Sequence, residues 1–273
     1  MPPSMPTAQI NGKDLYYRWE GERGEPLVFL NGILMSVDSW KLQTDFFKSR
    51  YRCLLHDFRG QLRSARQVEG LTLAEHVEDL RVLLDTQQVD RCHLVGTSYG
   101  GEVGLLFAST YPERVASLCA ITCVSYSDAL LKTQVALWRA LAGQEPGLLF
   151  DAVQSLSYSA AFLENDYEYV AERRAGFQRL PSDFFQGFTA LCTAFLAMDL
   201  TELLPQIEAP TQVIAAELDI LKPPHYSKLI ADSIPRADYA EIAGAGHAVV
   251  IERPSEINAL VDRFLNQHPI SSS

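Results

Sequence analysis

One stretch, Val95–Gly101, limits how this chain can fold more than any other part of the sequence. An apolar run at 92–95 leads into it, and a segment with helical character at 102–108 follows it. A serine between a buried strand and a helix lies on a sharp, strained turn, and the glycines two positions to either side of Ser98 leave room for that turn. Such a turn lifts the serine oxygen clear of the sheet and points a helix N-terminus at it. Glycine and serine also occur in ordinary turns, so the prediction of a nucleophilic Ser98 depends on its flanking elements and on partners further along the chain.

The composition is that of a globular protein. Of the 273 residues, 47% are hydrophobic and 21% are charged, which is usual for a folded domain. The formal net charge of −11 argues against nucleic acid or an anionic membrane surface as a partner. Met1–Pro6 has neither the basic nor the apolar region of a signal peptide, and no apolar run approaches the length of a membrane span. We therefore expect a cytoplasmic protein without membrane insertion, and the sequence leaves a homodimer open.

The cysteines and histidines suggest neither disulfides nor a metal site. The cysteines are five in number, which is odd, and no two form a C-x-x-C pair. Cys53, Cys92 and Cys119 lie inside apolar runs, where a free thiol behaves as a small hydrophobic side chain. Histidine and cysteine show no spacing of metal ligands. We expect no metal and no cofactor.

Strands and helices alternate along most of the chain, which predicts an α/β fold with a doubly wound, mostly parallel sheet. Asn11-Gly12 marks the turn of an initial hairpin. The strands expected after it are 27–30, 52–57, 92–95, 114–122, 210–216 and 237–242, and the expected helices are 40–48, 72–84, 102–108, 225–233 and 254–267. Thr72 and Glu75 have the spacing of a capping box.

The segment 125–203 differs from the rest of the chain. It has no strand pattern, is rich in aromatic residues and contains Pro146 and Pro181. We expect inserted helices that form a lid over the pocket. The predicted organisation is a core of residues 1–124 and 204–273 with the helical lid at 125–203. Most of the aromatic side chains in this segment are expected to pack the lid itself.

A serine hydroxyl is a poor nucleophile unless a base lies within hydrogen-bond reach and a third group orients that base. In a fold of this kind the order along the chain is serine, acid, histidine. Asp219 comes just after the strand 210–216, and His247 follows the strand 237–242. Both lie at C-terminal strand ends, where open α/β sheets collect their functional groups. We predict that His247 is the base and that Asp219 orients it.

Other residues compete for these two roles. Glu217 follows the same strand as Asp219, and Asp128 follows an earlier strand. The remaining histidines lie in strand, helix or tail contexts and are interpreted as structural, although His225 is near enough to Asp219 to be considered again. They are His56, His76, His93, His225 and His268.

A tetrahedral intermediate carries a negative oxygen and needs N–H donors aimed at it. The backbone amide of Tyr99 is expected to be one donor, because it follows the nucleophile at the start of the helix. The second is expected to be the amide of Ile33, in the loop after the strand 27–30. The Ile33 side chain has no part in this role.

Further motifs resemble those of α/β-hydrolases, and the resemblance covers nearly all of the chain. They are LVFLNG at 27–32, DFRGQLRS at 57–64, YPERV at 111–115, GAGH at 244–247 and ERP at 252–254. The resemblance implies a triad of Ser98, Asp219 and His247, with Ile33 and Tyr99 as oxyanion donors. The same residues are predicted above from their positions after the expected strands.

Two positions depart from the usual pattern of this family. Most such loops open with His-Gly, whereas this one has Asn31-Gly32, which is similar to 3-oxoadipate enol-lactonases and to acyltransferases that make the 3-(3-hydroxyalkanoyloxy)alkanoic acid precursors of rhamnolipids. The family usually has glycine where this chain has Leu62. A serine nucleophile argues against the dehalogenases and epoxide hydrolases of this fold, which use aspartate, but haloperoxidase-like perhydrolases share the triad.

We predict a serine hydrolase that cleaves a small-to-medium, largely apolar ester, thioester or lactone through an acyl-enzyme. Its partner is then a small-molecule acyl substrate. One alternative is an acyltransferase that joins 3-hydroxyacyl groups on the same triad, and another is a receptor that only binds its ligand. Carbon–carbon bond hydrolysis would need polar groups for an acidic substrate. The lid arginines that could serve are interpreted as solvated: Arg139, Arg173, Arg174 and Arg179.

Overall fold

The computed structural model describes residues 7–66 and 68–270. Met1–Pro6, on which the signal-peptide argument rests, and the Ser271–Ser273 end lie outside the described residues. The fold begins with a hairpin of β1 (Thr7–Ile10) and β2 (Lys13–Glu20). At its tip Asn11 and Gly12 have φ angles of 49° and 74°, the two positive values that a tight two-residue turn requires. The hairpin predicted from Asn11-Gly12 is therefore confirmed.

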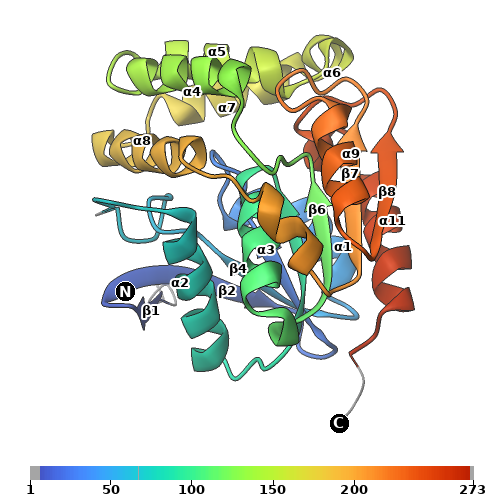
Figure 1. Ribbon diagram of the computed structural model, residues 1–273. Helices are drawn as coiled ribbons and strands as arrows, with labels where there is room; N and C mark the ends of the chain where they lie inside the picture. Colours follow the sequence, from blue (N-terminus) through green and yellow to red (C-terminus); the bar gives the residue numbers. More distant parts are fainter. Residues whose placement is uncertain (1–6, 67, 271–273) are drawn as a thin grey trace.

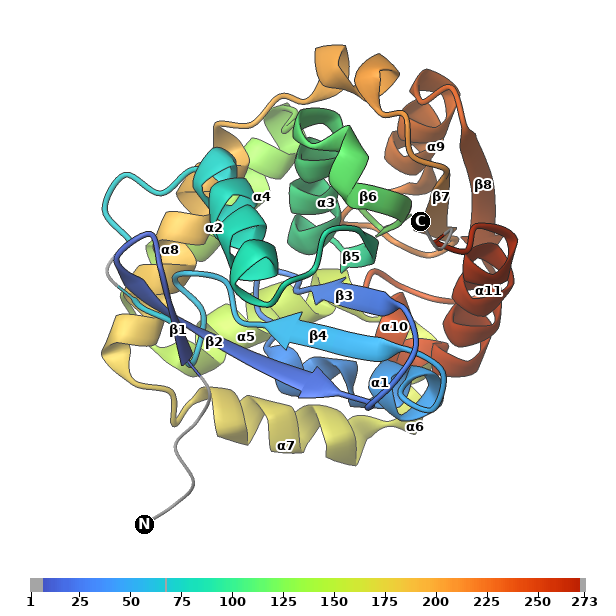
Figure 2. The same ribbon diagram turned by 90° about the horizontal axis from the view of Figure 1, so that it is seen from below.

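The hairpin forms one edge of an eight-stranded sheet with the order β1-β2-β4-β3-β5-β6-β7-β8 (Figure 2). The remaining strands are β3 (Pro26–Leu30), β4 (Arg52–His56), β5 (Cys92–Thr97), β6 (Val115–Ile121), β7 (Thr211–Ala216) and β8 (Ala237–Ile242). These strands pair in parallel, whereas β2 is antiparallel to both of its neighbours. The predicted doubly wound, mostly parallel sheet is confirmed. The strand expected to begin at Arg114 begins one residue later, because Pro112–Arg114 forms a 3₁₀ turn.

Helices cover both faces of this sheet (Figure 2). One face carries α2 (Leu73–Thr86), α3 (Tyr99–Thr110) and α9 (Pro224–Ser233), and the other carries α1 (Lys41–Phe47), α10 (Val249–Glu252) and α11 (Pro254–Gln267). In β3, Val28 and Leu30 pack with the first group, and Leu27 and Phe29 pack with the second. Alternate side chains of a strand point to opposite faces, so two hydrophobic cores hold the central strands between them.

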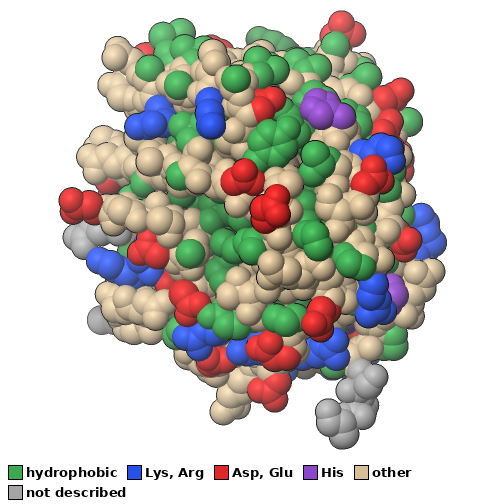
Figure 3. Space-filling view, in the orientation of Figure 1, with side chains coloured by type: hydrophobic (Ala, Val, Ile, Leu, Met, Phe, Trp, Pro, Cys, Tyr) green, Lys and Arg blue, Asp and Glu red, His purple; other side chains and the backbone are tan. Residues whose placement is uncertain are grey.

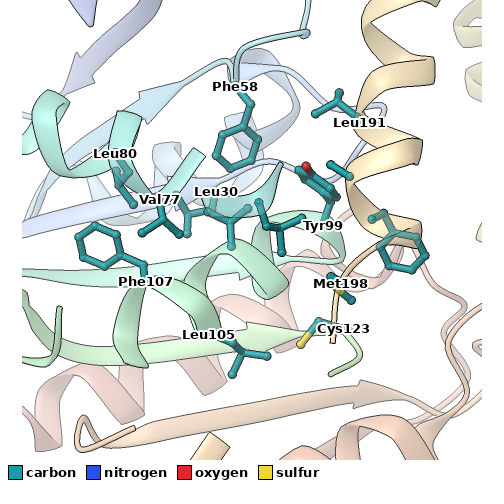
Figure 4. Packing of buried hydrophobic residues seen from close by; sticks show 14 of the residues in the cluster. Leu30, Phe58, Val77, Leu80, Tyr99, Leu105, Phe107, Cys123, Leu191 and Met198 are labelled. Atoms are coloured by element: carbon teal, nitrogen blue, oxygen red, sulfur yellow. The ribbon is translucent and has the colours of Figure 1, made fainter. Parts of the chain in front are cut away.

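Between β6 and β7 the chain forms a helical segment. Its helices are α4 (Ala129–Ala142), α5 (Pro146–Ser157), α6 (Ala160–Asn165), α7 (Tyr167–Phe177) and α8 (Ser182–Leu196). They lie together above the carboxyl ends of the parallel strands (Figure 1). The rings of Phe150 and Phe184 both contact Phe177, at 5.5 and 5.9 Å between centroids. Leu191 of α8 lies with Phe58 and Tyr99 (Figure 4), so α8 packs the helical segment onto the core.

Charges of both signs are interspersed over the face drawn in Figure 3. Among the helices of the described residues, none has both the length and the apolar character needed to cross a bilayer. All five cysteines are buried and unpaired, as expected for those in apolar runs. Burial raises the pKa of the Cys92 thiol to about 12, which leaves it unreactive at neutral pH.

Two histidines are buried among aromatic rings beneath the elbow. The Phe58 ring lies 4.9 Å from the rings of both His56 and His76, and the Tyr99 ring lies 5.6 Å from that of His76. No ring nitrogen of either histidine has a hydrogen-bond partner in the part of the chain that is described. Burial lowers the pKa of His56 to about 4. It lowers the pKa of His76 to about 3, with His56 and Arg59 adding to the effect.

We predict that these two histidines destabilise the fold as the pH falls from 7 to 5. In the unfolded chain a histidine binds a proton near pH 6.5, whereas in the fold His56 and His76 bind one only near pH 4 and pH 3. The unfolded state therefore gains protons first, at a cost of about 2 kcal/mol of stability for each histidine over this interval. Urea unfolding at both pH values measures the loss.

Leucine variants provide the controls for this prediction. His56→Leu and His76→Leu should each flatten the dependence of stability on pH, because each removes one group that titrates differently in the two states. Gln206→Leu, at an exposed position, removes no titratable group and should leave the dependence unchanged. Parallel curves for the wild type and all three variants would contradict the assignment.

Candidate active site

Ser98 lies on the turn between β5 and α3, with a φ of 52° and a ψ of −122°. A non-glycine residue in this region is strained. A Cβ atom on Gly96 would lie 2.3 Å from the carbonyl oxygen of Gly100, and one on Gly100 would lie 2.0 Å from the carbonyl oxygen of Leu30. Real Cβ atoms do not come so close to backbone. Only glycine fits at both positions, which is the reason for the sequence pattern around Ser98.

The structure brings Ser98, His247 and Asp219 into one hydrogen-bonded row. His247 Nε2 lies 2.9 Å from Ser98 Oγ, and His247 Nδ1 lies 2.7 Å from Asp219 Oδ2. A carboxylate only accepts hydrogen bonds, so Nδ1 donates to Asp219 and Nε2 is left to accept the Ser98 hydroxyl proton. Asp219 Oδ1 accepts the backbone N–H groups of Leu221 and Lys222 at 2.9 and 2.7 Å. The Asp219 side chain is fully buried, so its direction is fixed.

The competing residues lie elsewhere and have other partners. Glu217 is exposed and accepts the N–H of Gly244. Asp128 caps α4 and accepts the hydroxyl of Tyr226. The His225 ring lies tilted against the Tyr226 ring, with 4.1 Å between centroids. None of these three makes a hydrogen bond to His247 in the described structure.

The two amides expected to hold an oxyanion belong to residues that line the same cavity as Ser98. Tyr99 is the first residue of α3, so its N–H has no partner within the helix. The Ile33 amide also donates to no other group of the described residues. Ile33 belongs to the loop after β3, and the side chain of Gln61 holds that loop by donating to the carbonyl oxygens of Gly32 and Ile33 at 2.8 and 3.4 Å.

Asn31, one of the departures from the family pattern, connects this loop to the rest of the core. It is fully buried. Its Nδ2 donates to the His56 carbonyl at 3.1 Å and to Gln61 Oε1 at 3.0 Å, and its Oδ1 accepts the indole N–H of Trp40 at 2.9 Å. Asp57 also accepts from this amide, at 3.3 Å. Asn31 therefore fixes the segment whose next residues present the Ile33 amide.

Two charged residues beside Ser98 are missed by the sequence reasoning. Lys222 Nζ lies 3.2 Å from Ser98 Oγ and 2.5 Å from Glu102 Oε1. The two side chains are 4% and 0% exposed. One signal could have indicated this pair: Glu102 is the only charged residue of α3, and an isolated charge in an apolar helix needs a buried partner.

Ser98 and His247 open onto a cavity of about 140 Å³ beneath the helical segment. The wall is mostly apolar, with side chains from the core and from α4, α5, α7 and α8. Its aromatic members are Tyr99, Trp138, Phe150, Tyr158, Phe177 and Phe195. Burial raises the pKa of Tyr158 to about 12, so this phenol is neutral at pH 7.

One arginine of the helical segment, Arg173, differs from its interpretation as solvated. Arg173 lines the cavity, and its Nε is buried without a hydrogen-bond partner in the described chain. The Oε1 atom of Gln154, on the same wall, is in the same situation. The adjacent Arg174 instead forms an ion pair with Asp151 at 2.8 Å. Arg173 can therefore meet a polar group of a bound molecule.

Glu252 joins the loop of His247 to the helical segment. Its carboxylate accepts the N–H of Gly246 at 3.2 Å, and it accepts the N–H and the hydroxyl of Ser159 at 3.0 and 2.6 Å. The N–H of Ala248 donates to the Ser157 carbonyl at 2.8 Å. Bonds on both sides of His247 thus hold its loop against the junction of α5 and α6.

No group of three or more His, Cys, Asp or Glu side chains within residues 7–66 and 68–270 has the arrangement of a metal site. What the arrangement shows is a hydroxyl, an imidazole and a carboxylate in hydrogen-bond contact at the wall of an apolar cavity.

Comparison with known proteins agrees with the fold. A sequence model described as the alpha/beta hydrolase fold matches residues 25–157. A protein of Caulobacter sp. strain K31 named as a carbamate hydrolase, RutD, is 31% identical over 89% of this chain and 91% of its own length. Among solved structures, MGS-M2, an alpha/beta hydrolase enzyme from a Medee basin deep-sea metagenome library, has a TM-score of 0.93 at 27% identity over 98% of this chain and 100% of its own. The enol-lactonase of Burkholderia xenovorans LB400 has a TM-score of 0.88 at 27% identity, covering 96% and 100%.

We predict that Asn31→Ala lowers the free energy of unfolding by about 3 kcal/mol, because it leaves the buried indole N–H of Trp40 unpaired and also removes the hydrogen bonds that Asn31 donates to the His56 carbonyl and to Gln61. Chemical denaturation measures the loss. A matched control is Asn258→Ala, since Asn258 is also buried but its amide donates only to the Leu42 carbonyl among described residues. That variant should lose about 1 kcal/mol. Equal losses of stability in the two variants would contradict the prediction that Asn31 stabilises the fold more than an ordinary buried amide does.

Proposed function

The chain belongs to the α/β-hydrolase family, and on that premise we propose that it is a serine hydrolase with Ser98 as nucleophile, His247 as base and Asp219 as orienting acid. The observation that carries this proposal is the row of hydrogen bonds from Ser98 Oγ through His247 to Asp219 at the wall of an apolar cavity. The amides of Ile33 and Tyr99 are proposed to hold the oxyanion.

The reaction follows from these roles. His247 Nε2 takes the proton of Ser98 Oγ as this oxygen attacks the carbonyl carbon of the substrate. The electron pair displaced onto the carbonyl oxygen is stabilised by the two amides. His247 then gives its proton to the leaving group, and the acyl group stays on Ser98 as an ester. Water, deprotonated by the same histidine, attacks that ester and releases the acid. Asp219 stabilises the imidazolium formed in each step.

The proposed substrate is a small-to-medium, largely apolar ester, thioester or lactone. One water molecule needs about 10–15 Å³ of a cavity, so a cavity of about 140 Å³ admits a molecule of roughly ten heavy atoms. Trp138, Phe177 and Phe195 offer more apolar surface than a carbamate could use. This favours an acyl chain over the substrate class in the name of the Caulobacter relative. Helices α4–α8 are proposed to act as the lid. The unpaired cysteines support the cytoplasm as the compartment, because free thiols persist under reducing conditions.

We predict that Ser98→Ala and His247→Ala each lower kcat/KM by about 10⁴-fold or more, whereas Asp219→Asn costs about 10–100-fold less than the serine change. The serine forms the covalent bond and the histidine moves the proton, but the aspartate acts only through the histidine. Steady-state hydrolysis of p-nitrophenyl butyrate measures all three. Glu217→Gln and Asp128→Asn are the matched controls and should retain near wild-type rates. If either control proved more damaging than Asp219→Asn, the choice of acid would be wrong.

We predict a burst of p-nitrophenol that depends on Ser98 and is insensitive to acceptor. The assay mixes the protein with p-nitrophenyl acetate, butyrate and octanoate, with and without a medium-chain 3-hydroxyacyl acceptor. The size of the cavity predicts that octanoate reacts more slowly than butyrate. Release that rises with chain length and yields acylated acceptor would identify an acyltransferase. Binding without turnover would indicate a receptor.

A further inference from the structure

The loop after β7 brings a second functional group to Ser98 besides Asp219. The ammonium of Lys222 lies 3.2 Å from Ser98 Oγ, 2.5 Å from Glu102 Oε1 and 4.7 Å from the centroid of the Phe195 ring. An ammonium has three N–H donors and no acceptor. These three neighbours occupy the donors, the last as a cation–π contact. Lys222 is therefore held in one position against the nucleophile.

The hydrogen bonds of Ser98 Oγ complement those of Lys222. A hydroxyl has one donor and two acceptor lone pairs. His247 Nε2, at 2.9 Å, is an acceptor for the Ser98 proton, and Lys222 can only donate to one of the lone pairs. Together the two contacts fix the rotation of the hydroxyl so that its O–H points at the base. This is the geometry that proton transfer to His247 requires.

Stability does not account for burying this pair of charges. Removing two charged groups from water costs as much as their attraction returns, and apolar side chains of the same volume often serve as well or better. Glu102 Oε1 also accepts the N–H of Val124 at 3.1 Å, so two donors hold this oxygen in place, while Oε2 has no hydrogen-bond partner among the described residues. The pair is best explained by what it does at Ser98.

We propose that Lys222 is a further catalytic residue, which donates a hydrogen bond to Ser98 Oγ in both halves of the reaction, and that Glu102 is the residue that positions it. The proposal rests on the proposed function. In acylation, Ser98 Oγ forms a bond to the carbonyl carbon as its proton passes to His247, and Lys222 stabilises the electron density that remains on Oγ. In deacylation, the bond between that carbon and Oγ breaks, Oγ takes the electron pair, and His247 returns the proton to it. Lys222 keeps its own proton throughout.

The backbone of the loop after β7 explains how Asp219 can reach His247 while Lys222 reaches Ser98. Asp219 Oδ1 accepts the N–H of Lys222 at 2.7 Å. The same carboxylate that orients His247 through Oδ2 thus fixes the backbone from which the lysine extends. A displacement of this turn would disturb the base and the serine contact together. The nucleophile and its base are therefore positioned by one short loop.

The test separates the effect on Ser98 from any effect on folding. A fluorophosphonate probe forms a covalent bond with an activated serine whatever the natural substrate is, and its rate of labelling of Ser98 is measured together with Tm. Lys222→Met alone leaves Glu102 buried without its partner and is expected to lower Tm. The double variant Lys222→Met/Glu102→Gln removes both charges and keeps an acceptor for the N–H of Val124. It should recover Tm but label Ser98 about 10–100-fold more slowly than the wild type.

The controls assign each outcome to one cause. Lys228→Met, on the exposed side of α9, should label at the wild-type rate. A double variant that labels as fast as the wild type would show that the pair is only structural and would overturn the proposal. If the double variant does not recover Tm, the single variant Glu102→Gln is used in its place. An unchanged labelling rate in that variant would overturn the positioning role of Glu102, and a slower rate would support it. If wild-type Ser98 is not labelled at all, the proposed function itself fails.

Discussion

The close approach between the elbow and the end of β3 is the constraint on which the rest of the structure depends. A side chain at position 100 would push the start of α3 away from the end of β3, and a side chain at position 96 would push it away from β5. Because the start of α3 lies against the end of β3, Tyr99 and Ile33 line the same cavity as Ser98. The strained φ of Ser98 is the local cost of this arrangement. Two hydrophobic cores stabilise it from both faces of the sheet.

Around this point the protein buries polar groups that have partners. Asn31 connects β3 to the loop of Gln61, Asp219 accepts two backbone N–H groups and the imidazole, and Lys222 pairs with Glu102. Each side chain is held in one direction, because a buried polar group that turned away would lose its partner without gaining water. The protein itself therefore fixes the directions of these side chains.

Much of the fold followed from local patterns. The hairpin turn at Asn11-Gly12 and the capping box at Thr72 are determined by residues close in sequence, and both were predicted. Ser98, Asp219 and His247 could be chosen because parallel strands end at one edge of the sheet, and the structure brings them into hydrogen-bond contact. Arg173 was interpreted as solvated but lines the cavity, because the side of α7 that faces inward depends on how α5 and α7 pack.

By itself the sequence determined the α/β sheet, the sharp turn at Ser98 and the order of the residues that follow it, since these depend on strand and helix periods and on glycine. Only the tertiary structure decided that Lys222 meets Glu102 and Ser98. The residues of the ion pair are 120 positions apart. No local pattern relates them, and they meet because α3 and the loop after β7 pack against the same end of the sheet. A contact of that kind depends on the directions of buried side chains, which are set by packing and by the need to pair each charge that is removed from water.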